Sequence, residues 1–128
     1  TVPPNISQSI EHLLLINTAF HCESLRNCSR LQQLVINNCS GSIALPELKP
    51  GAVHELTIYG SDGVDFKNAR GFKNIHLEGI TINDLTPFLW QIKSGVLEIS
   101  PTCRLSDLCE RQLFELLVKG ERISGTVE

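Results

Sequence analysis

The chain has 128 residues and a formal net charge of −3, and its charged residues are interspersed without a block of like charges. This length suits one domain, predicted over residues 1–128, and the mild acidity argues against nucleic acid as a partner. No apolar run approaches the roughly 18 residues that cross a bilayer, and the residues after Thr1 lack a signal-peptide pattern, so no membrane span is expected.

A short apolar motif recurs along the whole chain. In each copy two apolar residues are separated by one residue, and successive copies begin 21, 22, 19, 22 and 19 residues apart. In five of the six copies another apolar residue stands three positions earlier. The spacing predicts six short strands, each with two side chains turned inward. Their first inward residues are Leu13, Leu34, Leu56, Ile75, Leu97 and Leu116.

One copy is complete enough to indicate a family. Residues 31–39 read LQQLVINNC, and this segment resembles the conserved segment of extracellular leucine-rich repeats position for position. The resemblance covers about residues 9–124. It implies an α/β solenoid, a curved array of about six repeats with a parallel β-sheet on the concave face. At the strand exit, Cys39 is expected to be a buried free thiol that satisfies backbone groups.

The segments between the expected strands carry glycine and proline, which favours irregular or 3-10 structure for most of them. Residues 83–93 and 106–111 are the exceptions and are expected to be short helices. A receptor L domain, which is a short β-helix with similar repeat lengths, is the alternative fold. In an L domain the return segments would be strands.

Cysteines and glycosylation sequons point to the secretory pathway. Five cysteines accompany three Asn-x-Ser sequons at Asn5, Asn27 and Asn38. We therefore expect a secreted protein or the extracellular side of the plasma membrane, the alternative being a cytosolic array with buried thiols.

Two cysteine pairs share the same spacing and are expected to form local disulfides, Cys22 with Cys28 and Cys103 with Cys109. The four histidines are scattered and no metal-ligand spacing occurs, so neither a metal nor a cofactor is expected. The cysteine-rich caps typical of extracellular repeat arrays are missing. The ends are therefore expected to be covered by a flanking domain, by a partner or by a second copy in a homodimer.

The side chains that alternate with the inward pairs define the expected binding face on the concave sheet. We expect an apolar zone beside an acidic one, which would suit a protein ligand or receptor with a basic surface. The residues expected to bind are Leu14, Val35, Glu55, Tyr59, His76, Glu78 and Glu98. The alternatives are that the segment around Pro3 and Pro4 covers the apolar zone, and that the acidic residues form only a solvated face.

Catalysis is not expected, because no nucleophile with a base and no phosphate-cradling glycine loop occurs. The sequence thus predicts an extracellular recognition module, with a structural or self-associating segment of a larger ectodomain as the alternative.

Overall fold

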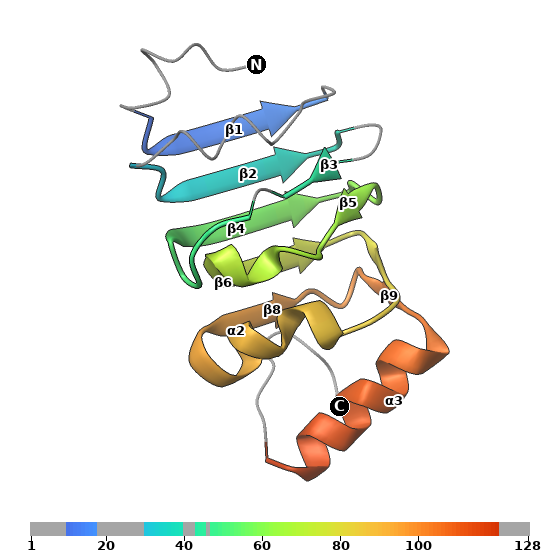
Figure 1. Ribbon diagram of the computed structural model, residues 1–128. Helices are drawn as coiled ribbons and strands as arrows, with labels where there is room; N and C mark the ends of the chain where they lie inside the picture. Colours follow the sequence, from blue (N-terminus) through green and yellow to red (C-terminus); the bar gives the residue numbers. More distant parts are fainter. Residues whose placement is uncertain (1–9, 18–29, 40–42, 46, 121–128) are drawn as a thin grey trace.

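The computed structural model describes residues 10–17, 30–39, 43–45 and 47–120. Its centre is a five-stranded parallel sheet in which the strands follow one another in chain order (Figure 1). The strands of this main sheet are β1 (His12–Ile16), β2 (Gln33–Asn37), β4 (Val53–Tyr59), β6 (Phe72–Glu78) and β8 (Val96–Ile99).

The described parts of the return segments lie on one side of the main sheet and contain short elements of several kinds (Figure 1). Two small parallel sheets join β3 (Ile43–Ala44) to β5 (Val64–Asp65) and β7 (Thr81–Ile82) to β9 (Arg104–Leu105). The helical elements are η2 (Ala69–Gly71), η3 (Thr86–Phe88), α2 (Leu89–Ser94) and α3 (Asp107–Val118). No described helix has both the length and the apolar character needed to cross a membrane.

The register of the main sheet aligns the recurring apolar pairs. Leu13 pairs with Leu34, Leu34 with Leu56, Leu56 with Ile75, and Ile75 with Leu97. From Leu34 onward these residues are buried, and their side chains form one continuous core with the second member of each pair. Because a strand alternates its side chains between two faces, this register leaves one face of the sheet free for other residues.

Each of the first four strands of the main sheet is followed by a residue with a left-handed backbone. These residues are Asn17, Asn38, Gly60 and Gly79, with φ of 50°, 55°, 60° and 67°. Asparagine and glycine are the residues that adopt this conformation at least cost, so the chain can turn sharply away from each strand. The equivalent position after β8 is Pro101, whose ring fixes φ near −65°. The regular series ends there.

Small side chains at the strand exits link neighbouring repeats. The backbone N–H of buried Cys39 donates to Ser61 Oγ at 2.9 Å, and Cys39 Sγ donates to the carbonyl of Leu15 at 3.4 Å. One turn further on, Ser61 Oγ donates to the carbonyl of Tyr59 at 3.1 Å. These bonds satisfy backbone groups that turn toward the interior.

The prediction of a sixth strand around Leu116 is wrong, because this region lies in α3. Ser106 caps the helix by accepting the N–H of Cys109 at 3.1 Å. Cys109 and Leu113 are buried and Leu116 is partly buried, a spacing of four and three residues that matches one face of a helix. The two helices expected from the sequence have different bounds in the structure. Residues 83–93, expected to be one helix, contain η3 and most of α2. The helix expected at residues 106–111 is the start of the longer α3.

The expected disulfide between Cys103 and Cys109 is absent, since both thiols are free in the structure. Cys109 is buried on the inner face of α3, whereas Cys103 Sγ donates to the carbonyl of Leu77 at 3.3 Å. The helix therefore holds one thiol in the core while the other joins the strand-exit bonds. The expected pair of Cys22 and Cys28 lies outside the described residues, as do the sequons at Asn5 and Asn27.

Candidate functional site

The face of the main sheet opposite the return segments, here called the open face, carries the expected binding residues in three rows. In-register pairing aligns Leu14, Val35, Thr57, His76 and Glu98 in the middle row. Tyr59 pairs with Glu78 in one flanking row, and Gln33 pairs with Glu55 in the other. Residues more than 80 positions apart in sequence are therefore brought onto one surface.

The first end of the open face is apolar. Leu14 is 56% exposed and Ile16 is 49% exposed on β1, and Val35 lies beside Leu14 on β2. Exposed aliphatic side chains grouped in this way are typical of a contact surface.

A ladder of polar side chains runs across β1, β2 and β4. Gln33 Oε1 lies 3.1 Å from His12 Nδ1, and Gln33 Nε2 donates to Glu55 Oε1 at 3.0 Å. The expected site residue Glu55 therefore belongs to this ladder. The interaction of His12 with Gln33 was not predicted, although the two residues occupy equivalent positions in successive repeats.

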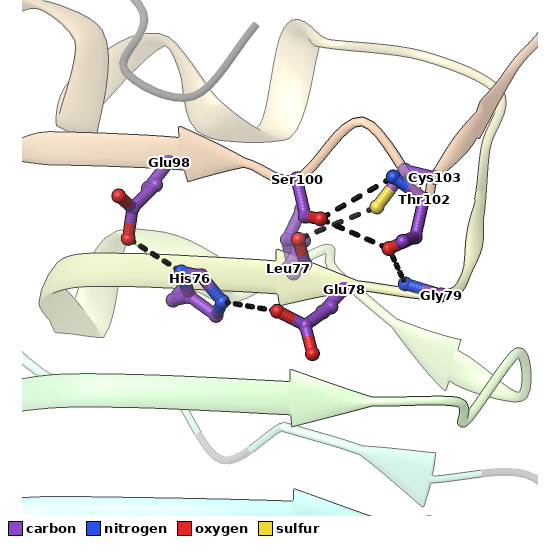
Figure 2. Close-up of polar contacts among 8 residues, drawn as sticks. All are labelled: His76, Leu77, Glu78, Gly79, Glu98, Ser100, Thr102 and Cys103. Carbon is purple, nitrogen blue, oxygen red and sulfur yellow. Dashed lines mark hydrogen bonds and ion pairs between the residues drawn. The ribbon is translucent and has the colours of Figure 1, made fainter.

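His76 forms the centre of a second cluster, which is drawn in Figure 2. Its Nδ1 lies 2.5 Å from Glu98 Oε1 on β8, and its Nε2 lies 3.2 Å from Glu78 Oε1 on its own strand. Burial alone would lower the pKa of His76, but hydrogen bonds to Glu98 and Glu78 and their negative charges raise it above its usual value.

Tyr59 completes this cluster from β4. The centroids of the Tyr59 and His76 rings are 6.0 Å apart and the rings are tilted by 58°. The open face thus brings together Tyr59, His76, Glu78 and Glu98, which we call the acidic patch. Glu55 belongs to the polar ladder, while Leu14 and Val35 lie toward the other end of the sheet.

Asn38, the one sequon asparagine that the structure describes, is exposed after β2, and its Nδ2 donates to Asn17 Oδ1 at 2.9 Å. A glycan on this nitrogen would replace one of its two hydrogens and leave one N–H to donate.

A second apolar surface lies on α3 and was missed by the sequence reading. Phe114 is 69% exposed and Val118 is 70% exposed, and Leu117 lies on the same side of the helix. Reading residues 113–118 as a strand concealed it. The signal that identifies the helix is the capping Ser106 followed by apolar residues at helical spacing.

A groove of about 350 Å³ between two return segments is lined in part by Asp62, Asp65 and Asp84. Asp62 Oδ1 accepts the N–H of Thr81 at 2.8 Å, and Asp65 Oδ1 accepts that of Lys67 at 3.0 Å. Asp62 therefore links two neighbouring return segments, whereas Asp65 stabilises a local turn.

Asp84 Oδ1 accepts the backbone N–H of Thr86 at 2.9 Å and Nε2 of Gln112 on α3 at 2.7 Å, and these bonds lower the pKa of Asp84. Within the described ranges, no three His, Cys, Asp or Glu side chains are placed to hold a metal ion.

Comparisons with models of protein families, with curated proteins and with solved structures found no match. Any function proposed for this chain therefore has to come from its own residues.

Proposed function

We propose that the chain is an extracellular leucine-rich-repeat solenoid that binds a protein partner through its open face and acts without catalysis. The recurring apolar pairs, the in-register parallel sheet and the left-handed strand exits support the fold. The three Asn-x-Ser sequons favour an extracellular location, whereas the free thiols of Cys39, Cys103 and Cys109 would suit the cytosolic alternative. The observation that carries the proposal is the acidic patch, because four expected binding residues meet there.

The chemistry of the acidic patch suits a basic partner. The Glu78 and Glu98 side chains are 43% and 48% exposed, so their carboxylates can reach a cation on another molecule. Tyr59 adds an aromatic ring of the kind enriched at interaction hot spots. We expect association that depends on charge and weakens as salt is added.

Charge reversal tests the proposed face. Fluorescent tetramers of the wild-type protein and of the double variant Glu78→Lys, Glu98→Lys would be compared for binding to a panel of cell lines by flow cytometry. The matched control is Glu47→Lys, Glu110→Lys, which changes the same charge at exposed positions outside the main sheet. We expect the reversal on the open face to abolish binding and the control to retain it.

Equal binding by all three proteins would refute the open face as the site. Tyr59→Ala provides an independent check, with an expected loss of about tenfold or more if the ring is a hot spot. If the wild-type protein bound none of the cell lines, extracellular recognition itself would be contradicted.

Self-association is a second candidate function, favoured by the exposed apolar residues at both ends of the described array. Leu14 and Ile16 lie on β1, and Phe114 and Val118 lie on α3. Analytical ultracentrifugation at high concentration tests it: a dimer that Phe114→Glu dissociates would support this candidate, and a strict monomer would contradict it.

For the fold, the alternative remains the β-helix of receptor L domains. The two small parallel sheets among the return segments favour it, whereas η3 and α2 favour the leucine-rich form.

A further inference from the structure

Both ring nitrogens of His76 face carboxylates. Nδ1 contacts Glu98 and Nε2 contacts Glu78, as Figure 2 shows. An ionised carboxylate can only accept hydrogen bonds, and a neutral imidazole has a single N–H to donate. The two contacts are therefore satisfied together only when the ring carries both protons.

His76 is more enclosed than the two glutamates that it contacts. Its side chain is 22% exposed, about half as much as those of Glu78 and Glu98. On the neighbouring strand β4, Thr57 is paired with His76 and Tyr59 places its ring against it, and β8 contributes the carboxylate of Glu98. The charges that act on His76 are those of Glu98 and Glu78. The histidine is thus the enclosed member of the cluster, and the glutamates are the members that solvent and other molecules can reach.

We propose that His76 is a proton-operated switch of the open face, holding Glu78 and Glu98 while it is protonated and releasing one of them when it loses its proton. The proton passes to solvent, and the net charge of the three side chains changes from −1 to −2. This inference rests on the proposed function, because the released carboxylate matters only if the open face binds a cationic partner. Such a partner then binds more tightly as pH rises through the titration of His76.

The first experiment uses the protein alone. The Cε1 proton of His76 would be followed by NMR from pH 5 to pH 9 in the wild type, in Glu98→Gln and in Glu78→Gln. We expect a pKa above the ordinary histidine value of about 6.5 in the wild type, and a lower pKa in each variant. A wild-type pKa at or below that value, or a pKa that neither variant changes, would overturn the switch regardless of what the protein binds.

The second experiment uses a defined cationic probe, a ten-residue peptide of alternating arginine and glycine. Its affinity would be measured by calorimetry between pH 5.5 and pH 8.5 at constant ionic strength. We expect the wild-type affinity to rise about fivefold across the His76 titration, roughly the effect of one unit charge near a solvated ion pair. His76→Gln should remove this dependence, and His54→Gln, at an exposed histidine on β4, should keep it.

The outcomes separate the two proposals. Binding that is equal at every pH would overturn the switch and leave the proposed face intact. If the peptide bound at no pH, the basic partner of the proposed function would be contradicted, and the NMR titration would still decide whether the switch exists.

Discussion

Gln91 on α2 joins two neighbouring return segments, and replacing it with methionine should measure the strength of that link. The side chain is fully buried, and its Nε2 donates to the carbonyls of Ala69 at 2.6 Å and Phe72 at 2.7 Å. Methionine has a similar length and volume but no N–H, so the change removes both bonds with little loss of packing.

The expected cost follows from these contacts. The Phe72 carbonyl loses the Gln91 donor at a cost of about 1–2 kcal/mol, and the Ala69 carbonyl, which keeps the N–H of Phe72 as a donor, adds about 0.5–1 kcal/mol. Part of this cost is offset, because methionine also removes Oε1 of Gln91. This buried oxygen has no hydrogen-bond partner among the described residues, so its burial is unfavourable in the wild type. We therefore expect Gln91→Met to lower the free energy of unfolding by about 1–3 kcal/mol, measured by urea denaturation at pH 7.

Gln91→Glu separates hydrogen bonding from packing. An ionised carboxylate beside two carbonyl oxygens is repelled by both, so the buried glutamate should keep its proton in the folded state. Its folded pKa would then exceed its unfolded pKa, and the variant should lose stability as pH rises above the unfolded value of about 4.3. The control is Gln32→Met, at an exposed glutamine. If Gln91→Met were within about 0.5 kcal/mol of the wild type, the proposed link between return segments would be refuted.

Three further predictions follow from other parts of the structure. Gly79→Ala, at φ of 67°, should lower the free energy of unfolding by about 1–2 kcal/mol. Asn38→Gly, also at a left-handed strand exit, should lower it by less. Chemical denaturation of both variants checks this prediction. The raised pKa of His76 should stabilise the protein fully below its unfolded pKa of about 6.5, and this contribution should disappear as pH rises through the folded pKa. The melting temperature of wild type minus that of His76→Gln should therefore fall with pH, and a difference that rises with pH would contradict the prediction. Burial and nearby negative charges raise the pKa of Cys109 to about 11. Alkylation of the native protein should therefore modify the partly exposed Cys103 first. Mass spectrometry that found the two thiols joined in a disulfide would contradict this prediction.

Local spacing is enough to predict the strands of the main sheet, because each needs only an apolar pair and a turn. Leu34 and Ile36 alternate with Val35, and the same pattern recurs at Leu56 and Ile58. Parallel stacking of equivalent residues then brings Tyr59, His76, Glu78 and Glu98 onto one face, so the composition of the acidic patch was predictable without coordinates.

The end of the array was not predicted, because residues 113–118 fit two periods at once. Leu116 and Val118 match the strand pattern, whereas Cys109, Leu113 and Leu116 match a helix. Tertiary context favours the helix, since Ser106 caps it and the inner face of α3 contributes to the core. Pro101, at a position where the earlier repeats have Asn or Gly, was the local signal that the repeat changes.

The individual contacts of His76 were also beyond prediction. The repeat places Glu98 on the neighbouring strand, but a period fixes only the position of a Cα atom. Whether the imidazole turns toward Glu98, Glu78 or Tyr59 depends on side-chain rotamers, on the hydrogen bonds to the two glutamates and on the ring contact with Tyr59. The same limit applies to Cys103 and Cys109, since equal spacing does not place two thiols in bonding geometry.

A solution NMR assignment tests the stacked-repeat architecture most directly. The structure predicts strand-type carbon shifts in the five strands of the main sheet, parallel-sheet cross-peaks between Leu34 and Leu56 and between Leu56 and Ile75, and helical shifts through residues 107–118. Antiparallel cross-peaks between these strands, or strand-type shifts at residues 113–118, would contradict it.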